Sequence, residues 1–385
     1  MVDRLVVAGL AGLRWAVAQP LPDDDVYAGA AGVLRALAEA HMGGHRAFDK
    51  VALELRDRLI AAPLGAEPGL YVGTAGHVAA LAAWAAASGD ATAAASAAEH
   101  ARRLAAGPVP TSRDVINGQA GLLLVLVAAG ERDGAARVAD ALATAAEPAP
   151  GGVQWRHTAT ATYLMPGLSH GTAGVVLALA RAAGLLDRRD LLALARAGGQ
   201  QLLVLGRRDD GTVALPLTVP PQPAPPHQGW GWCHGPTGTV QAFLALAAHD
   251  LAWQPALDAA LAALRASGVP ERRYPGFWDN VAQCCGTAGV LDLALDRYQA
   301  STDPDWLSWA GVLADDLLTH AVPVDGADDA ALTWSNVEHR RPDPVLPPEP
   351  GWMQGTAGVA AALLRTARLR RDGPAAARVP WPDRA

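Results

Sequence analysis

The amino-acid sequence predicts an all-α protein built from repeated helical hairpins. Alanine-rich stretches recur along the 385 residues, of which 51% are hydrophobic and only 5% are aromatic. This composition favours closely packed helices over sheets of aromatic and β-branched strands. The second observation is a Gly-x-x-Gly tetrapeptide followed by an apolar run, which occurs seven times and indicates an internal repeat.

The seven tetrapeptides set the boundaries of the predicted repeats. Their first glycines lie 44 to 69 residues apart, which leaves room for two helices and their connections. The run after each tetrapeptide, such as residues 175–181, is apolar nearly all round, as is typical of a buried helix. The more polar half of each repeat, such as residues 91–104, is expected to form an outer layer. The first glycines are Gly29, Gly73, Gly118, Gly171, Gly235, Gly286 and Gly355.

Three segments lie outside this regular pattern. Residues 4–18 are expected to form an amphipathic helix, because Arg14 interrupts the unbroken apolar stretch that a signal peptide needs. The predicted apolar face of this helix contains Leu5, Val6, Leu10, Leu13 and Val17. Residues 209–229 and 322–350 are rich in proline and cannot be continuous helix, so they are either substrate clamps or plain connecting loops.

Charge and cysteine content restrict the class of protein. The net charge of -7, without long runs of like sign, does not fit a nucleic-acid partner. No apolar stretch reaches the length of a membrane span. The three cysteines are an odd number and include two neighbours, so thiols in a reducing, cytoplasmic compartment are expected rather than a disulfide framework.

All three cysteines stand directly before the tetrapeptides of repeats five and six. The repeats carry different side chains at or near this level: Tyr27, Tyr71, Asp114, His170, Cys233 with His234, and Cys284 with Cys285. If the repeats close into a ring, these side chains face the same cavity. Thiolate and imidazole ligands favour zinc, and a catalytic zinc site keeps three protein ligands and one open position. The pattern therefore predicts a metal site at the ends of the repeats.

The order of these motifs resembles the lanthionine synthetase C-like cyclase family. The resemblance rests on the seven tetrapeptides and covers about residues 27–364. The motifs that carry it are Ser169-His170-Gly171, Trp232-Cys233-His234-Gly235 and Cys284-Cys285-Gly286. The resemblance implies a double-ring α/α toroid of seven inner and seven outer helices, forming one domain over residues 1–385 with residues 365–385 as a C-terminal tail.

The resemblance also implies a set of site residues. Cys233 and Cys284 match the two cysteine ligands of the family's zinc ion. Cys285 stands where most members have a histidine ligand, which implies a three-cysteine site like that of some cyclase domains of bifunctional synthetases. His170 matches the family's proposed acid–base histidine, and Asp114 matches the acidic residue of its third repeat.

The chemistry of such a cyclase requires a thiolate and a proton donor. A free thiol has a pKa of about 8.5 and is mostly protonated at neutral pH, so zinc is expected to bind the substrate sulfur as its reactive anion. His170 is the first candidate for returning a proton to the substrate, and His234 is the second. Asp114 fits either a functional role or an N-terminal helix cap. Structural roles are expected for His157, His227, His249, His320 and His339.

The sequence thus predicts a cyclase that adds a precursor-peptide cysteine to dehydroalanine or dehydrobutyrine, forming lanthionine or methyllanthionine rings. Its expected partners are the dehydrated peptide and a separate dehydratase or kinase-lyase. Two alternatives stay open, an enzyme that adds a small thiol such as glutathione and a non-catalytic peptide-binding toroid. A glycosidase would need a pair of inward carboxylates, whereas the starts of the repeats offer only Asp114.

Overall fold

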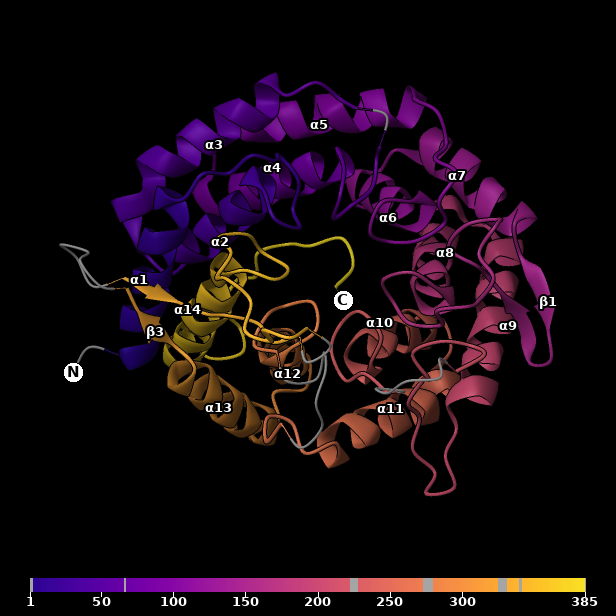
Figure 1. Cartoon of the computed structure of the whole chain (residues 1–385). Helices are drawn as coiled ribbons and strands as arrows, with labels where there is room; N and C mark the ends of the chain where they lie inside the picture. Colours follow the sequence, from indigo (N-terminus) through magenta and orange to yellow (C-terminus); the bar gives the residue numbers. More distant parts are fainter. Residues whose placement is uncertain are drawn as a thin grey trace. The chain divides into compact units, whose positions relative to one another are not determined.

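The computed structural model describes residues 3–65, 67–221, 228–272, 280–324, 331–338 and 341–384. These residues form α-helices with two short β-hairpins (Figure 1). None of the helices in this part of the chain is both long and apolar enough to cross a membrane. The chain divides into two compact units: unit 1 contains Met1–Pro63, Ala80–Ser96 and Val269–Pro380, and unit 2 contains Leu64–Ala79, Ala97–Gly268 and Trp381–Ala385.

Unit 1 contains three packed pairs of helices. In each pair, the first helix starts within a Gly-x-x-Gly tetrapeptide and is buried over most of its length, whereas its partner is buried on one side. The pairs are α2 (Ala30–Met42) with α3 (Asp49–Ala61), α12 (Thr287–Ser301) with α13 (Pro304–Thr319), and α14 (Thr356–Asp372) with α1 (Arg4–Ala18). A short 3₁₀-helix η1 (Arg46–Phe48) precedes α3. The buried helix α14 also packs on α2 and α12.

Unit 2 repeats the same arrangement. Its pairs are α6 (Gln119–Ala129) with α7 (Arg132–Thr144), α8 (Thr172–Leu186) with α9 (Arg189–Gly206), and α10 (Pro236–Ala247) with α11 (Gln254–Ala266). The 3₁₀-helix η2 (Leu251–Trp253) leads into α11. The buried helix α8 packs on both α6 and α10. The second repeat supplies α4 (Ala75–Ser88) and α5 (Ala91–Ala106), each of which has residues in both units.

Both β-hairpins lead into a buried tryptophan. Strands β1 (Glu147–Ala149) and β2 (Gly152–Gln154) are antiparallel, as are β3 (Val322–Pro323) and β4 (Leu332–Thr333). After β2, the indole of Trp155 donates to the carbonyl of Leu142 at 2.8 Å, and after β4, the indole of Trp334 donates to the carbonyl of Leu317 at 2.7 Å. The described start of the 322–350 insertion is therefore packed against a helix end.

The N-terminal helix α1 completes the seventh repeat. It packs along α14, and Figure 1 shows the two helices side by side. Small residues make this contact close, because a Cβ added at Gly9 would meet Leu364, and one at Gly12 would meet Trp334. The expectation of a helix over residues 4–18 is confirmed. Its fully buried face, however, contains Leu5, Ala8, Gly9, Ala11, Gly12, Leu13 and Ala16, rather than Val6, Leu10 and Val17.

The glycines of the tetrapeptides are required by the close return of the preceding turn. A Cβ at Gly174 would overlap the carbonyl oxygen of Leu168, and one at Gly289 would overlap that of Gln283. The first N–H groups of the helices are satisfied by the same turns, as where Gln119 N–H donates to the Ser112 carbonyl at 2.9 Å. The N–H groups at these helix starts thus find their acceptors in the turn directly before the helix.

We expect Gly174→Ala to lower the free energy of unfolding by about 1–3 kcal/mol, because the new methyl group has no space beside Leu168. Gly184, in the same helix α8, is the matched control, because a Cβ there meets nothing closer than 3.6 Å. Gly184→Ala should leave this free energy unchanged or raise it by up to about 1 kcal/mol. Urea unfolding monitored by circular dichroism measures both, and equal effects at the two sites would contradict the packing argument.

Candidate functional site

The turns that precede the tetrapeptides are joined to one another by backbone hydrogen bonds. In unit 2, the N–H of Tyr71 donates to the carbonyl of Ile116 at 2.9 Å. The N–H of Val115 donates to the carbonyl of Ser169, and the N–H of Ser169 donates to that of Cys233, both at 3.0 Å. These bonds place the turns of repeats two to five in one register.

Unit 1 continues the same pattern over repeats six, seven and one. The N–H of Cys284 donates to the carbonyl of Met353, and the N–H of Met353 donates to that of Tyr27, both at 2.9 Å. All three residues stand two positions before the first glycine of their tetrapeptide, as Cys233 does in repeat five. Cys233 and Cys284 therefore occupy equivalent positions, and Cys285 occupies the next position toward the helix.

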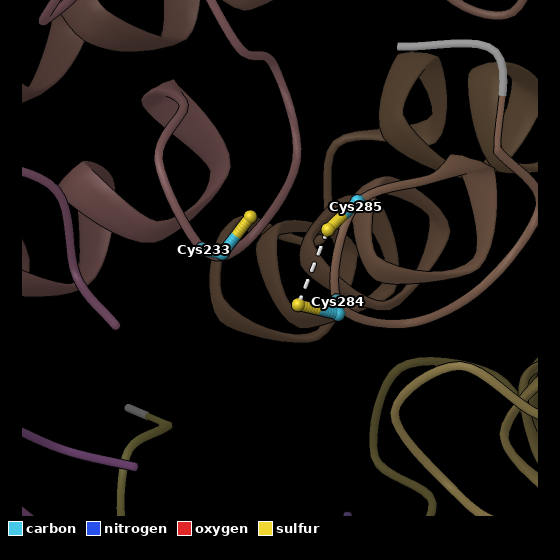
Figure 2. A group of neighbouring side chains, drawn as sticks. All are labelled: Cys233, Cys284 and Cys285. Atoms are coloured by element: carbon cyan, nitrogen blue, oxygen red, sulfur yellow. Dashed lines mark hydrogen bonds between the residues drawn. The ribbon is translucent and has the colours of Figure 1, made fainter. Parts of the chain in front are cut away.

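The three cysteines are buried and form no disulfide, and Figure 2 shows how their side chains lie. The Sγ atoms of Cys284 and Cys285 lie 3.3 Å apart, which is too long for a disulfide and fits two neighbouring thiols. Cys233 comes from the turn before α10. The three sulfur atoms all lie within 4.8 Å of one another and form a group of the kind that can hold a metal ion.

Two neutral side chains of unit 1 donate toward the paired thiols. The Tyr27 hydroxyl lies 3.8 Å from Cys284 Sγ, and the Gln354 amide nitrogen lies 3.6 Å from Cys285 Sγ. Burial, and then the negative charge of the two cysteines, raises the pKa of Tyr27, so its hydroxyl stays protonated and can donate. The amide of Asn336 donates to the side-chain oxygen of Gln354 at 3.1 Å and fixes its orientation. Such donors offset negative charge on the sulfur atoms.

Sequence reasoning noticed Tyr27 but missed Gln354. The sequence position could have revealed Gln354, because it stands directly before Gly355, just as Cys285 stands directly before Gly286.

Asp114 and His170 form a hydrogen-bonded pair in unit 2. His170 Nδ1 lies 2.6 Å from Asp114 Oδ2, and Asp114 is buried, with 2% of its surface exposed. The backbone N–H of Asn117 donates to the other carboxylate oxygen at 3.1 Å. The carboxylate therefore accepts the Nδ1 proton of His170 and leaves Nε2 as the nitrogen available for chemistry. Asp114 thus holds its own turn and orients the histidine ring. It does not cap α6, whose N-cap is Gly118 without a side-chain hydrogen bond. The functional role of Asp114 stays a prediction.

The rings of two more histidines lie near that of His170. The ring of His234 lies 6.1 Å from it and that of His157 lies 6.3 Å from it, measured between centroids. Burial, and then the charge of His170, lowers the pKa of His157, so this ring is neutral near pH 7. The sequence did not predict its position beside His170, because His157 lies in the irregular segment after β2 and not in one of the turns that precede the tetrapeptides.

Four more histidines were expected to have structural roles, and the structure describes two of them. His249 Nε2 is 2.9 Å from the carbonyl of Ala180, and His320 Nδ1 is 2.8 Å from that of Asp316, as expected for structural histidines. His227 and His339 fall outside the described residues.

Comparison with known structures supports the predicted fold. The chain is similar to nisin cyclase, with a TM-score of 0.65, 15% sequence identity, and coverage of 94% of this chain and 93% of that one. It also matches cellobiose 2-epimerase from Spirochaeta thermophila, with a TM-score of 0.43, 16% identity, and coverage of 95% and 96%. No curated protein sequence matches the chain. The similarity to nisin cyclase confirms the α/α-toroid fold class.

The profile of one sequence family matches residues 20–372, a range that includes all seven tetrapeptides, the three buried thiols and the Asp114–His170 pair. The resemblance drawn from the motifs is thereby confirmed, and the chain belongs to the family of lanthionine synthetase C-like proteins.

Proposed function

We propose that the protein is a zinc-dependent cyclase that adds a peptide cysteine to a dehydrated serine or threonine residue. The observation that carries this proposal is the group of three buried thiols in a member of the lanthionine synthetase C-like family. A group of sulfur ligands of this kind favours zinc over hard cations such as Mg²⁺.

The residues of the chain fit a zinc ion. Cys233, Cys284 and Cys285 would hold it, and a fourth position would remain for the substrate. Three thiolates would give the site a net charge of -1 before the substrate binds. The hydroxyl of Tyr27 and the amide of Gln354 donate toward two of the sulfur atoms and reduce the charge that each must carry. When bound, zinc supplies the anionic form of the substrate sulfur near neutral pH.

The Asp114–His170 pair suits the return of the proton. Attack of the sulfur on the β-carbon of the dehydrated residue forms a carbon–sulfur bond and moves the π electrons to the α-carbon side as an enolate. The protonated imidazole of His170 then gives its Nε2 proton to the α-carbon. Asp114 holds the Nδ1 proton and stabilises the charged ring. The proton lost by the substrate thiol restores the charge of His170, so the net reaction adds S–H across the double bond.

The substrate is proposed to be a precursor peptide dehydrated by a separate dehydratase or kinase-lyase. His234 remains the second candidate for the proton donor, because its ring lies close to that of His170. Cyclisation, glutathione addition and a non-catalytic scaffold predict different products from a dehydrated peptide. Incubation of a dehydrated peptide with and without glutathione, followed by mass spectrometry, distinguishes a ring, an adduct and no reaction.

We expect the purified protein to contain one zinc ion per chain, and Cys233→Ala and Cys284→Ala to lose it, because each removes one of three sulfur ligands. Inductively coupled plasma mass spectrometry measures the metal, and circular dichroism confirms folding. His320→Ala, at an exposed histidine, serves as the control and should keep the metal. Metal-free wild-type protein from zinc-replete medium would refute the proposal.

Cys285→His should keep zinc but slow carbon–sulfur bond formation. Imidazole is neutral, so it leaves less electron density on the metal than a thiolate and makes the bound substrate sulfur less nucleophilic. The rate of ring closure in single-turnover experiments measures this difference. A variant that closes rings as fast as the wild type would show that the third thiolate has no part in activating the sulfur.

His170→Asn should retain zinc and slow cyclisation by about a hundredfold to ten-thousandfold, because the proton donor is lost and no sulfur ligand is touched. Asp114→Asn should also retain zinc and slow the reaction, since the amide cannot stabilise a charged imidazole. Metal content and single-turnover rates on a dehydrated peptide are measured together, with His320→Asn as the control. Wild-type rates in His170→Asn would transfer the proton donor's role to His234 or to water.

A further inference from the structure

The C-terminal segment of the chain is buried in unit 2. Helix α14 ends at Asp372, and the chain then returns so that Trp381 and Asp383 are 6% and 0% exposed. A fully buried carboxylate is costly unless hydrogen bonds or opposite charges compensate for the lost water. The burial of these two side chains therefore requires an explanation.

The contacts of Asp383 explain this burial. Its Oδ2 atom accepts a hydrogen bond of 2.6 Å from the Tyr71 hydroxyl and another of 3.1 Å from the Trp232 indole. The indole of Trp381 donates to the same Tyr71 oxygen at 3.1 Å. The rings of Tyr71 and Trp232 also meet edge to face, with centroids 4.7 Å apart. Three aromatic residues and one carboxylate thus form a single hydrogen-bonded group.

A half-buried cation also contacts this segment. Arg181, on α8, donates to the carbonyl of Pro382. Burial lowers the pKa of Arg181, and the charge of Asp383 acts against this effect. A buried carboxylate needs such partners, because isolated charges are costly away from water.

The residues that Asp383 holds belong to the turns of the candidate site. Trp232 directly precedes Cys233, and Tyr71 lies in the equivalent turn of repeat two. The Cys233 carbonyl is itself held by the N–H and the hydroxyl of Ser169, at 3.0 and 3.1 Å. Cys233 is therefore fixed from one side by Ser169 and, through the neighbouring indole, by the C-terminal segment.

We infer that Asp383 is a positioning residue for the candidate site. Its carboxylate holds Trp232, and thereby keeps the thiol of Cys233 in the orientation in which it meets a metal ion. The segment with Trp381 and Asp383 thus helps to position a residue of the candidate site. The inference rests on the proposed function only for metal binding, because the orientation of Cys233 can be measured without metal.

Asp383→Ala tests the inference, with Asp383→Asn as the conservative variant that keeps one acceptor oxygen. In metal-free protein, Cys233 should react faster with iodoacetamide in Asp383→Ala than in the wild type, because the turn opens more often. Peptide mass spectrometry resolves the labelling of each cysteine, and Cys284 and Cys285 act as internal controls whose rates should not change. Zinc affinity, from chelator competition, should fall about tenfold.

Further variants separate the contact from general destabilisation. Asp372→Ala removes an exposed carboxylate at the end of α14 and should change neither measurement. Trp232→Phe removes the indole donor while keeping an aromatic ring, and it should raise Cys233 labelling as Asp383→Ala does. If the two changes act through one hydrogen bond, the double variant should be less affected than the sum of the single ones.

The outcomes are distinct. Unchanged Cys233 labelling in folded Asp383→Ala would overturn the inference, and so would equal acceleration at all three cysteines. If Asp383→Ala does not fold, Cys233 labelling is measured in Trp232→Phe and Tyr71→Phe instead, since each removes a single donor to the carboxylate. Unchanged labelling in both variants would then overturn the inference. Altered labelling combined with absence of zinc in the wild type would uphold the positioning role and reject the proposed zinc site.

Discussion

Backbone hydrogen bonds between successive turns hold the repeat residues of the candidate site in register. They run from Tyr71 to Ile116 and from Ser169 to Cys233 in one unit, and from Cys284 through Met353 to Tyr27 in the other. Each requires the turn to fold back onto the start of its own helix, which is possible only where glycine leaves space for the carbonyl of the turn. The tetrapeptide glycines are thus the origin of the register in which the site residues stand, although none of them carries chemistry.

Because of this register, side chains from neighbouring turns lie beside the thiols and influence how much negative charge the sulfur atoms can carry. Two adjacent thiols in one turn would bring two negative charges close together when deprotonated, which burial makes unfavourable. The neighbouring turns of the same unit supply neutral donors, the Tyr27 hydroxyl and the Gln354 amide, rather than cations. Neutral donors weaken the repulsion without cancelling the charge. In the proposed reaction, the sulfur atoms would then keep the electron density that makes a substrate thiolate reactive.

Much of the fold could be predicted from the sequence, because the repeat is written in it directly. The tetrapeptides fix the buried helices, and the position of Cys233 and Cys284 before them predicts that the two thiols are equivalent. The positions of His157 beside His170 and of Asp383 beside Trp232 could not be predicted, because His157 and Asp383 lie in irregular segments whose partners are remote in the chain. The same holds for α1, which packs on α14 although more than 300 residues separate them, and whose buried face consists largely of alanine and glycine. A hydrophobic pattern emphasises large side chains and so misplaces such a face.

The construction of the turns explains how one fold can carry different chemistry at each repeat. Every residue except proline has the N–H and the carbonyl that join neighbouring turns, so these bonds hold whichever side chain follows. The residues directly before the first glycines show this freedom: Ala28, Val72, Asn117, His170, His234, Cys285 and Gln354. A change from histidine to cysteine at one of these positions therefore alters the charge and the nucleophilicity of the site while leaving the scaffold intact. By contrast, a side chain that reaches into a turn from outside the repeat, as Asp383 does at Trp232, depends on the conformation of a single segment.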